Sequence, residues 1–439
     1  MTLDSKIEYL RENRSTLAYR AILFFAVVYF LRPEDFIPGL SLVPISKITG
    51  AIALIALVFG TKAENRQKLP AEMKVLIALL LHMILTIPFA FWRGGALDIV
   101  INKFSKGVII ALLIVFVVTS LKELRKLIYV QCASIALVTF VSLLVHNVRD
   151  GRLNGIQKGI LENPNDLAIN IAINFPLCVA FMLAAKGVVR KSVWALGIAF
   201  LMYGVIATYS RSGLIAMVIT CVICLWEFAL KGRRPVLLIA TAGVAFIGVA
   251  VMMSTRNYVT RIESMVQGNI KGSRDHGSLD ERKELLKTSL GLMAKHPIFG
   301  IGPGNFPSYT GSWLVAHNTY TELGAEAGLP GLFLFLLLLA LSARKIKAVR
   351  KLPGYKESAE IRLWTTAFFA GLAAYMAGAM FASTEYNLFP YFLVGYICAL
   401  HHIAKTTKAV PTPTLDSRTE DQGDLQYGPS SKRQLVLSR

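Results

Sequence analysis

The chain has 439 residues, of which 54% are hydrophobic and only 17% are charged, and its mean hydropathy is +0.53. A soluble globular domain carries roughly 25% charged residues, so this composition excludes soluble enzymes, collagen-like repeats and disordered regulators. The formal net charge of +20 would indicate nucleic-acid binding in a soluble protein. In a membrane protein that charge must first be interpreted by its position along the chain.

Apolar runs of about 18 residues or more recur along the chain, and each is long enough to cross a bilayer as a helix. The first run, 21–31, is short enough for a signal peptide, but a proline-rich turn follows it instead of a small-residue cleavage site. The sequence predicts an all-α integral membrane protein of about twelve transmembrane helices. These are expected near residues 17–31, 43–60, 73–92, 101–120, 127–146, 167–185, 192–209, 213–230, 235–253, 325–342, 362–382 and 389–404.

Lys and Arg residues gather in alternate connections between these runs. By the positive-inside rule those connections and both termini are predicted to be cytoplasmic. Most of the net charge is then a signal of topology, and no nucleic-acid partner is expected. The basic segments are the N-terminal tail, 62–68, 122–126, 186–191, 231–234, 344–362 and the segment after 404.

Four regions follow from this topology. Residues 1–253 hold the first nine predicted spans, 254–324 form a large periplasmic loop, 325–404 hold the last three spans, and 405–439 form a disordered cytoplasmic tail. The large loop is too long for a simple connector, so we expect it to build part of a site. Its basic residues outnumber its acids, which indicates an anionic ligand or merely the exemption of long loops from the charge rule.

Three outward-facing residues are candidates for chemistry. Arg211 lies in TYSRSG (208–213) at the outer junction of two spans, Arg282 begins an amphipathic helix in the large loop, and His317 opens HNTYTELGAEAGLPG (317–331). In that amphipathic helix Leu285, Leu286, Leu290 and Met293 are expected to form the apolar stripe, with Arg282 and Ser289 flanking it. Taken singly, each candidate has an ordinary explanation: a snorkelling interfacial Arg, a solvated charge and a helix-capping His.

No metal or other cofactor is expected. A zinc site would want a second His four residues after His317, where Thr321 stands, and Cys221 and Cys224 have neither a second pair nor a nearby His. We expect no carboxylate cluster on the outer side. GIGPGN (300–305) is similar to a phosphate-binding loop, but it follows no strand, and we interpret it as a structural turn.

The combination of these motifs resembles the bacterial O-antigen ligase and polymerase superfamily. The resemblance is carried by SRSGL (210–214), by ER followed by HPIFGIGPGNF (281–306), by residues 317–331 and by ENPNDLA (162–168). It implies a GT-C-like membrane glycosyltransferase of the bacterial inner membrane, with its active site facing the periplasm. The donor would be a glycan on undecaprenyl pyrophosphate.

The resemblance also implies roles for the candidates. Arg211 and Arg282 would bind the pyrophosphate, and His317 would orient or deprotonate the acceptor hydroxyl. Two guanidiniums would take the place of a metal ion, so the reaction would be metal-independent, and a single displacement would invert the anomeric carbon. Asn318, Glu322 and Asn165 are candidate supporting residues, although helix capping and loop hydrogen bonds explain each of them nearly as well.

The acceptor stays open between lipid A-core, a growing glycan and a protein. We favour a ligase that transfers to a lipid A-core sugar, with an O-antigen or exopolysaccharide polymerase as the alternative. A twelve-span glycolipid transporter is a third interpretation. Against transport, the two halves of the chain are unlike each other and the candidate charges lie at the outer boundary, away from the bilayer midplane.

Overall fold

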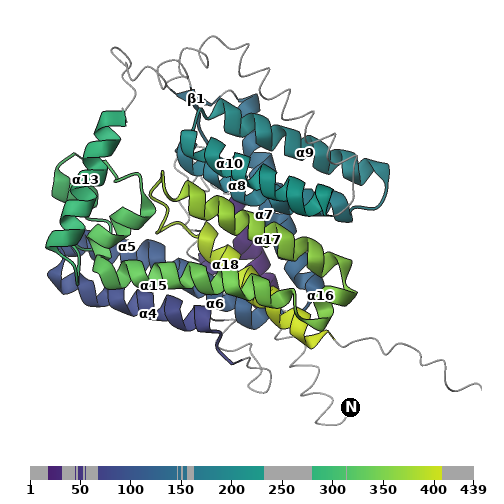
Figure 1. Cartoon of the computed structure of the whole chain (residues 1–439), viewed down its shortest axis with the longest axis horizontal. Coiled ribbons are helices and arrows are strands. Elements are labelled where there is room, and N and C mark those ends of the chain that lie inside the picture. The colour runs from purple at the N-terminus through teal and green to yellow at the C-terminus, as the bar shows by residue number, and fades with distance from the viewer. Residues whose placement is uncertain are drawn as a thin grey trace, which may run out of the picture.

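The computed structural model describes residues 18–31, 45, 48–52, 55, 68–145, 147–149, 152–155, 163–231, 279–312 and 314–407. In this part of the chain the protein is helical, with one short two-stranded ribbon (Figure 1). The elements are the helix Ala18–Leu31, α4 (Ala71–Thr86), η3 (Ile87–Phe89), α5 (Arg93–Ile99), η4 (Val100–Phe104), α6 (Ser105–Val117), α7 (Leu121–Leu144), β1 (Val148–Arg149), β2 (Arg152–Leu153), α8 (Pro164–Ala184), α9 (Val188–Ala207), α10 (Arg211–Cys224), η5 (Leu225–Leu230), α13 (Leu279–Lys295), α14 (Phe306–Thr310), α15 (Thr319–Val349), α16 (Pro353–Glu357), α17 (Ala359–Gly378) and α18 (Phe389–Thr406).

Seven stretches of helix in the described residues are long and apolar enough to cross a membrane, so the chain is a multi-pass membrane protein. They are Ala71–Phe89, Arg93–Val117, Leu121–Leu144, Pro164–Ala184, Val188–Ala207, Arg211–Leu230 and Thr319–Val349, at seven of the positions expected from hydropathy.

Three further helices lie where spans are expected but are not among the seven: Ala18–Leu31, α17 and α18. The expected span 235–253, most of the one at 43–60 and the tail after residue 407 lie outside the described residues.

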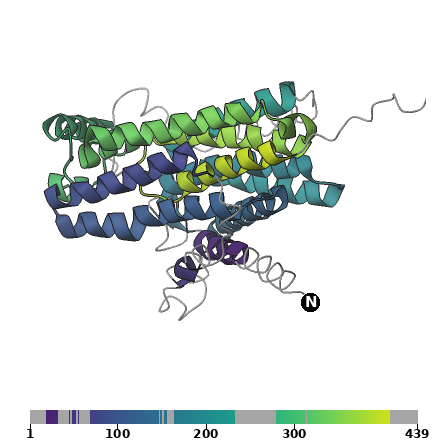
Figure 2. The same cartoon turned by 90° about the horizontal axis from the view of Figure 1, so that it is seen from below.

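The long helices run side by side, and their connections alternate between two ends of the bundle (Figure 1). One end holds the basic connections after α6, α8 and α15, as the charge pattern predicts; the other holds α13 and the starts of α8, α10 and α15. We call the second end the outer end. Figure 2 shows the helix Ala18–Leu31 on one side of the bundle, where Phe30 contacts Phe392 of α18 with ring centroids 4.8 Å apart.

The centre of the bundle is formed by α8, which packs against α7, α9, α10 and α17. Its buried face includes Asn174, whose Oδ1 accepts from Gln131 Nε2 of α7 at 2.8 Å, while Tyr396 of α18 donates to Gln131 Oε1 at 2.7 Å. In lipid the helices gain little from hydrophobic burial against one another, so hydrogen bonds of this kind help to fix which helices pack together.

A break in α15 anchors the outer end. Pro330 has no N–H, and Gly328 adopts φ 69° and ψ −179°, so the carbonyls of the preceding turn lose their helical partners. Other segments supply donors instead: Ile301 N–H reaches the Ala325 carbonyl and Gly302 N–H reaches the Glu326 carbonyl, both at 2.9 Å. The segment 300–302 is therefore fixed onto α15 by the helix break itself.

A buried ion pair ties three helices together at the opposite end. Lys345 of α15 pairs with Glu72 of α4, and the Cys398 thiol of α18 lies 3.7 Å from the same carboxylate. Glu72 is only 2% exposed, so an unpaired charge there would be costly, and the pair favours one register of these helices.

Candidate active site

Arg282 lies on the face of α13 that turns toward the bundle. The predicted stripe was partly wrong, because Leu286 and Leu290 are 37% and 43% exposed. Leu285, Ser289 and Leu292 form the buried face. Ser289 can lie in an apolar contact because its hydroxyl donates to a backbone carbonyl of its own helix at 2.9 Å. Arg282 precedes Leu285 by about one turn, so it shares this face and is partly buried rather than fully solvated.

The backbone on both sides of His317 is fixed. His317 itself has φ 54°, a left-handed conformation that is uncommon for any residue other than glycine. The Asn318 side chain caps α15 by accepting from Tyr320 N at 3.0 Å and Thr321 N at 3.1 Å. Glu322 Oε2 accepts from Ala316 N at 2.9 Å. Two of the predicted supporting residues thus position the segment that carries His317.

The positive charges of two arginines act on His317. Burial, together with the positive charges of Arg282 and Arg152, lowers the pKa of His317 to about 4. The imidazole is therefore neutral at physiological pH and can accept a proton. Arg282 was expected near His317, whereas Arg152 was not.

Arg211 is the first residue of α10 and follows a tightly bonded turn. Ser210 caps the helix by accepting from Gly213 N at 3.2 Å, and its hydroxyl donates to Asn165 Oδ1 at 2.8 Å. Tyr209 has φ 49° and is, with His317, one of the two non-glycine residues at positive φ in the described part of the chain. Strained backbone of this kind persists where the surroundings hold it in place, and it clusters at functional sites.

Asn165, the third predicted supporting residue, joins this turn to the start of α8. Its Oδ1 accepts from Arg152 Nη2 at 3.0 Å as well as from Ser210, and Arg152 Nε donates to the Thr208 carbonyl at 3.0 Å. Arg152, on strand β2, was missed because RLNG carries no recognised motif. Its signal was only its place in an outer loop just before ENPNDLA.

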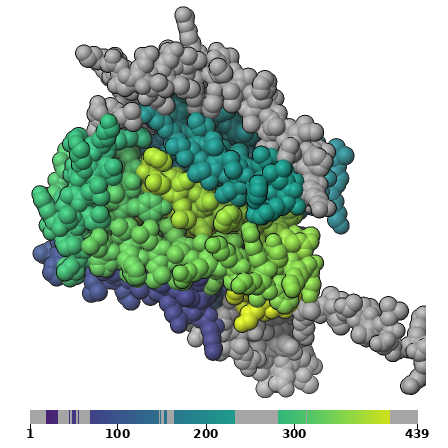
Figure 3. All heavy atoms as spheres, viewed as in Figure 1, coloured from purple at the N-terminus to yellow at the C-terminus, as the bar shows by residue number. Residues whose placement is uncertain are grey.

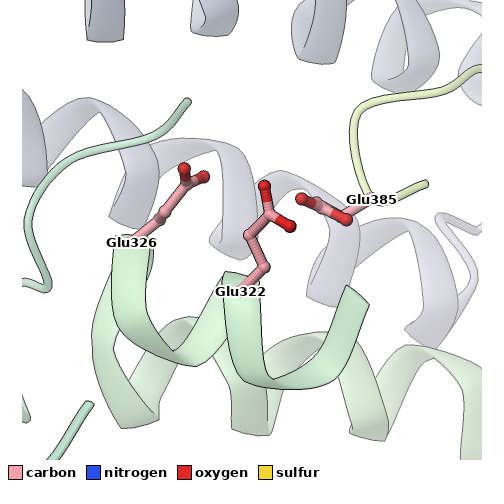
Figure 4. Close-up of side chains that lie close together, drawn as sticks. All are labelled: Glu322, Glu326 and Glu385. Carbon is pink, nitrogen blue, oxygen red and sulfur yellow. The ribbon is translucent and has the colours of Figure 1, made fainter. Parts of the chain in front are cut away.

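Three buried carboxylates, Glu322, Glu326 and Glu385, lie close together (Figure 4). Their nearest oxygens are all within 4.8 Å of one another, so the expectation that the outer side lacks a carboxylate cluster was wrong. Glu385 comes from the segment between α17 and α18, far along the chain, which is why sequence spacing did not reveal it. An oxygen-rich cluster of this kind is what a hard cation such as Ca²⁺ would require.

The oxygens of two of these carboxylates are already used by the outer loops. Glu326 accepts from Gly304 N at 2.7 Å, Phe306 N at 2.8 Å and Tyr386 Oη at 2.6 Å. Glu322 accepts from Ala316 N and from the Ser383 hydroxyl. Burial and the nearby charge of Glu326 raise the pKa of Glu385 to about 8, so this third carboxyl is protonated at neutral pH. These hydrogen bonds indicate that the cluster fixes the outer loops rather than binding a metal ion.

The same bonds explain GIGPGN. Its N–H groups donate to α15, from Ile301, Gly302 and Gly304, or to the nearby carbonyls of His296 and Gly302, and not toward an open anion site. The interpretation of this segment as a structural turn is confirmed. In Gly300, at φ 66°, an added Cβ would lie 2.3 Å from the Glu326 backbone, so no larger residue fits there.

The outer end therefore combines positive groups with one neutral base. The helix starts of α8, α10 and α15 carry partial positive charge, and Arg152, Arg211 and Arg282 add three guanidiniums. In Figure 3 the green surface around α13 and the teal surface around α10 flank the yellow-green end of α17. Such an arrangement can bind an anionic group beside a proton acceptor.

Comparison with known families agrees with the motifs. The O-antigen ligase family model matches residues 195–336, from α9 to within α15, and confirms the resemblance to the O-antigen ligase and polymerase superfamily. The match contains Arg211, Arg282 and His317. No curated protein matches the chain.

Proposed function

We propose that this chain, which carries the O-antigen ligase domain over residues 195–336, is an O-antigen ligase of the bacterial inner membrane. It would transfer a glycan from undecaprenyl pyrophosphate to a sugar hydroxyl of lipid A-core on the periplasmic face. The observation that carries the proposal is His317, which is held in a strained conformation and kept neutral by burial and by the charges of Arg282, inside the matched domain, and Arg152, outside it.

The chemistry follows from these groups. The acceptor hydroxyl oxygen attacks the anomeric carbon of the donor sugar, and the bond from that carbon to the pyrophosphate oxygen breaks. The bonding electrons leave with the lipid pyrophosphate, whose growing negative charge Arg211 and Arg282 stabilise. The proton of the hydroxyl passes to His317. Attack from the face opposite the leaving group inverts the anomeric carbon.

The regions expected from the sequence fit this reaction. In the proposal, 1–253 and 325–404 form the membrane part with both termini in the cytoplasm, in a GT-C-like arrangement. Residues 254–324 cover the donor on the periplasmic side, and 405–439 form a cytoplasmic tail outside the site. Asn165 holds the turn before Arg211, and Asn318 and Glu322 hold the segment that carries His317.

The proposal is tested by replacing Arg211, Arg282 or His317 with Ala in a strain that lacks the chromosomal gene. Each variant should reach the membrane at the normal level but leave polymer attached to undecaprenyl pyrophosphate. Single repeats in the deletion strain would instead identify a polymerase. Normal lipopolysaccharide with His317→Ala would remove the base assignment.

A further inference from the structure

The two-stranded ribbon β1–β2 places Arg152 against the turn that precedes Arg211. Val148 pairs with Leu153 and Arg149 with Arg152, so the ribbon is a tight hairpin, and Asn154 N–H continues the pairing to the Asn147 carbonyl at 2.9 Å. The backbone of Arg152 is therefore fixed by the hydrogen bonds of the ribbon, and its side chain extends from there to two other segments.

The guanidinium spans two buried acceptors. Nε donates to the carbonyl of Thr208, which is fully buried, and Nη2 donates to Oδ1 of Asn165, which is 7% exposed. Acceptors buried to this degree are costly to leave without a donor. Nε and Nη2 project along one edge of a planar group, so a single rigid side chain joins the end of α9 to the start of α8.

Arg211 depends on this bridge through two links. The Asn165 oxygen that accepts from Arg152 also accepts from Ser210, and the Ser210 oxygen caps α10 immediately before Arg211. Between Thr208 and Ser210 lies Tyr209 at φ 49°, a conformation that persists only when its neighbours are held. Arg152 bonds to the residue before Tyr209 and, through Asn165, to the residue after it.

Arg152 also contributes to the field at the base. Its charge acts on His317 together with that of Arg282, although the three residues come from β2, α13 and the segment before α15. One guanidinium thus bonds to the turn before Arg211 and acts through its charge on His317.

We infer that Arg152 is a positioning residue of the donor site: its forked hydrogen bonds to Thr208 and Asn165 hold Arg211 in place for a lipid-linked pyrophosphate, and its charge keeps that site cationic. The inference rests on the proposed function for the identity of the ligand. Arg152 contributes in two ways, through its two hydrogen bonds and through its positive charge, and substitutions can test the two separately.

The first measurement is the affinity of the full-length protein in detergent for undecaprenyl pyrophosphate, a probe that needs no glycan. Arg152→Ala removes fork and charge, whereas Arg152→Lys keeps the charge but cannot make both bonds in one plane. Each should weaken binding about tenfold or more, the scale of one hydrogen bond to a charged group. Arg93→Ala, which removes an exposed guanidinium at the same end of the bundle, is the matched control and should bind normally.

The second measurement is the pH dependence of glycan transfer, with lipid extract of the deletion strain as the source of donor. Arg152→Ala removes a positive charge from His317, so the acid limb should move to higher pH, whereas Arg152→Lys should keep the wild-type limb. If Arg152 were merely structural, its substitution would change the affinity for undecaprenyl pyrophosphate, but the pH profiles of the Ala and Lys variants would not differ. Normal affinity in both variants, or full rescue of affinity by Lys, would overturn the inference. If Arg152→Ala does not fold, Arg152→Lys carries the test alone.

The two proposals fail in different ways. If Arg211→Ala and Arg282→Ala bind undecaprenyl pyrophosphate as tightly as wild type, the proposed function is wrong. If those variants lose binding while both Arg152 variants behave like Arg93→Ala, the proposed function stands and only the role of Arg152 is wrong.

Discussion

Glu326 is the residue on which the outer loop most directly depends, and Glu326→Gln should loosen that loop. The carboxylate is fully buried and accepts three hydrogen bonds, two of them from the backbone N–H groups of Gly304 and Phe306. The glutamine amide has one oxygen and one NH₂ group. Because the two N–H groups bind different oxygens of Glu326, one of them must face the NH₂ group and lose its acceptor.

The size of the effect follows from this count. A buried donor left without a partner costs about 1–3 kcal/mol, so local opening of residues 300–306 should become roughly 5 to 150 times more frequent. Tyr386 adds little to the loss, because its hydroxyl can turn to accept from the new NH₂ group instead of donating. The carbonyls of Ala325 and Glu326 still hold 301 and 302, so the change should stay local.

Hydrogen exchange measured by mass spectrometry on peptides that cover 300–310 reports this opening directly. Exchange there should speed up by the stated factor, while peptides of α8 and α17 stay unchanged. Glu284→Gln, on the exposed side of α13, is the matched control and should leave the loop at its wild-type rate. Wild-type exchange in Glu326→Gln would show that the carboxylate does not hold the loop.

Two further predictions concern the reaction. The lowered pKa keeps His317 neutral until the pH falls through about 4, so the rate of transfer should stay nearly constant from pH 8 to about 5.5. An ordinary histidine as the base would instead halve the rate near pH 6.5. A midpoint near 6.5 in the pH–rate profile would therefore contradict a His317 that is buried and close to arginine charges. EDTA should leave transfer unchanged, because Glu322 and Glu326 already accept hydrogen bonds from the loops. A loss of activity that Mg²⁺ or Ca²⁺ restores would show instead that the carboxylate cluster binds a metal ion.

Hydropathy predicted the positions of helices whether they are exposed or buried. α9 is largely exposed and α8 is largely buried, yet both are long and apolar enough for composition alone to reveal them. α17 and α18 also lie where spans were expected, and their buried surfaces carry polar groups such as Thr365 and Tyr396. Their positions were predicted, but their place at the centre depends on packing that no run of residues encodes locally.

The site was predictable where a motif carries its own geometry. Asn318 precedes an apolar helix and therefore caps it, and Ser210 does the same for α10. Arg152 and Glu385 were missed because each comes from a connection between helices and meets the site only through tertiary packing. The face of α13 was misjudged for a related reason: Ser289 hides its hydroxyl in its own helix and is buried in place of a leucine.

The central claim is that the chain makes a new glycosidic bond at the outer end of the bundle. Purified wild-type protein in lipid vesicles should convert a radiolabelled undecaprenyl-pyrophosphate glycan and lipid A-core into a labelled covalent product, and His317→Ala should form none. A label that only crosses the vesicle membrane, with no covalent product from wild-type protein, would contradict the assignment and indicate a transporter.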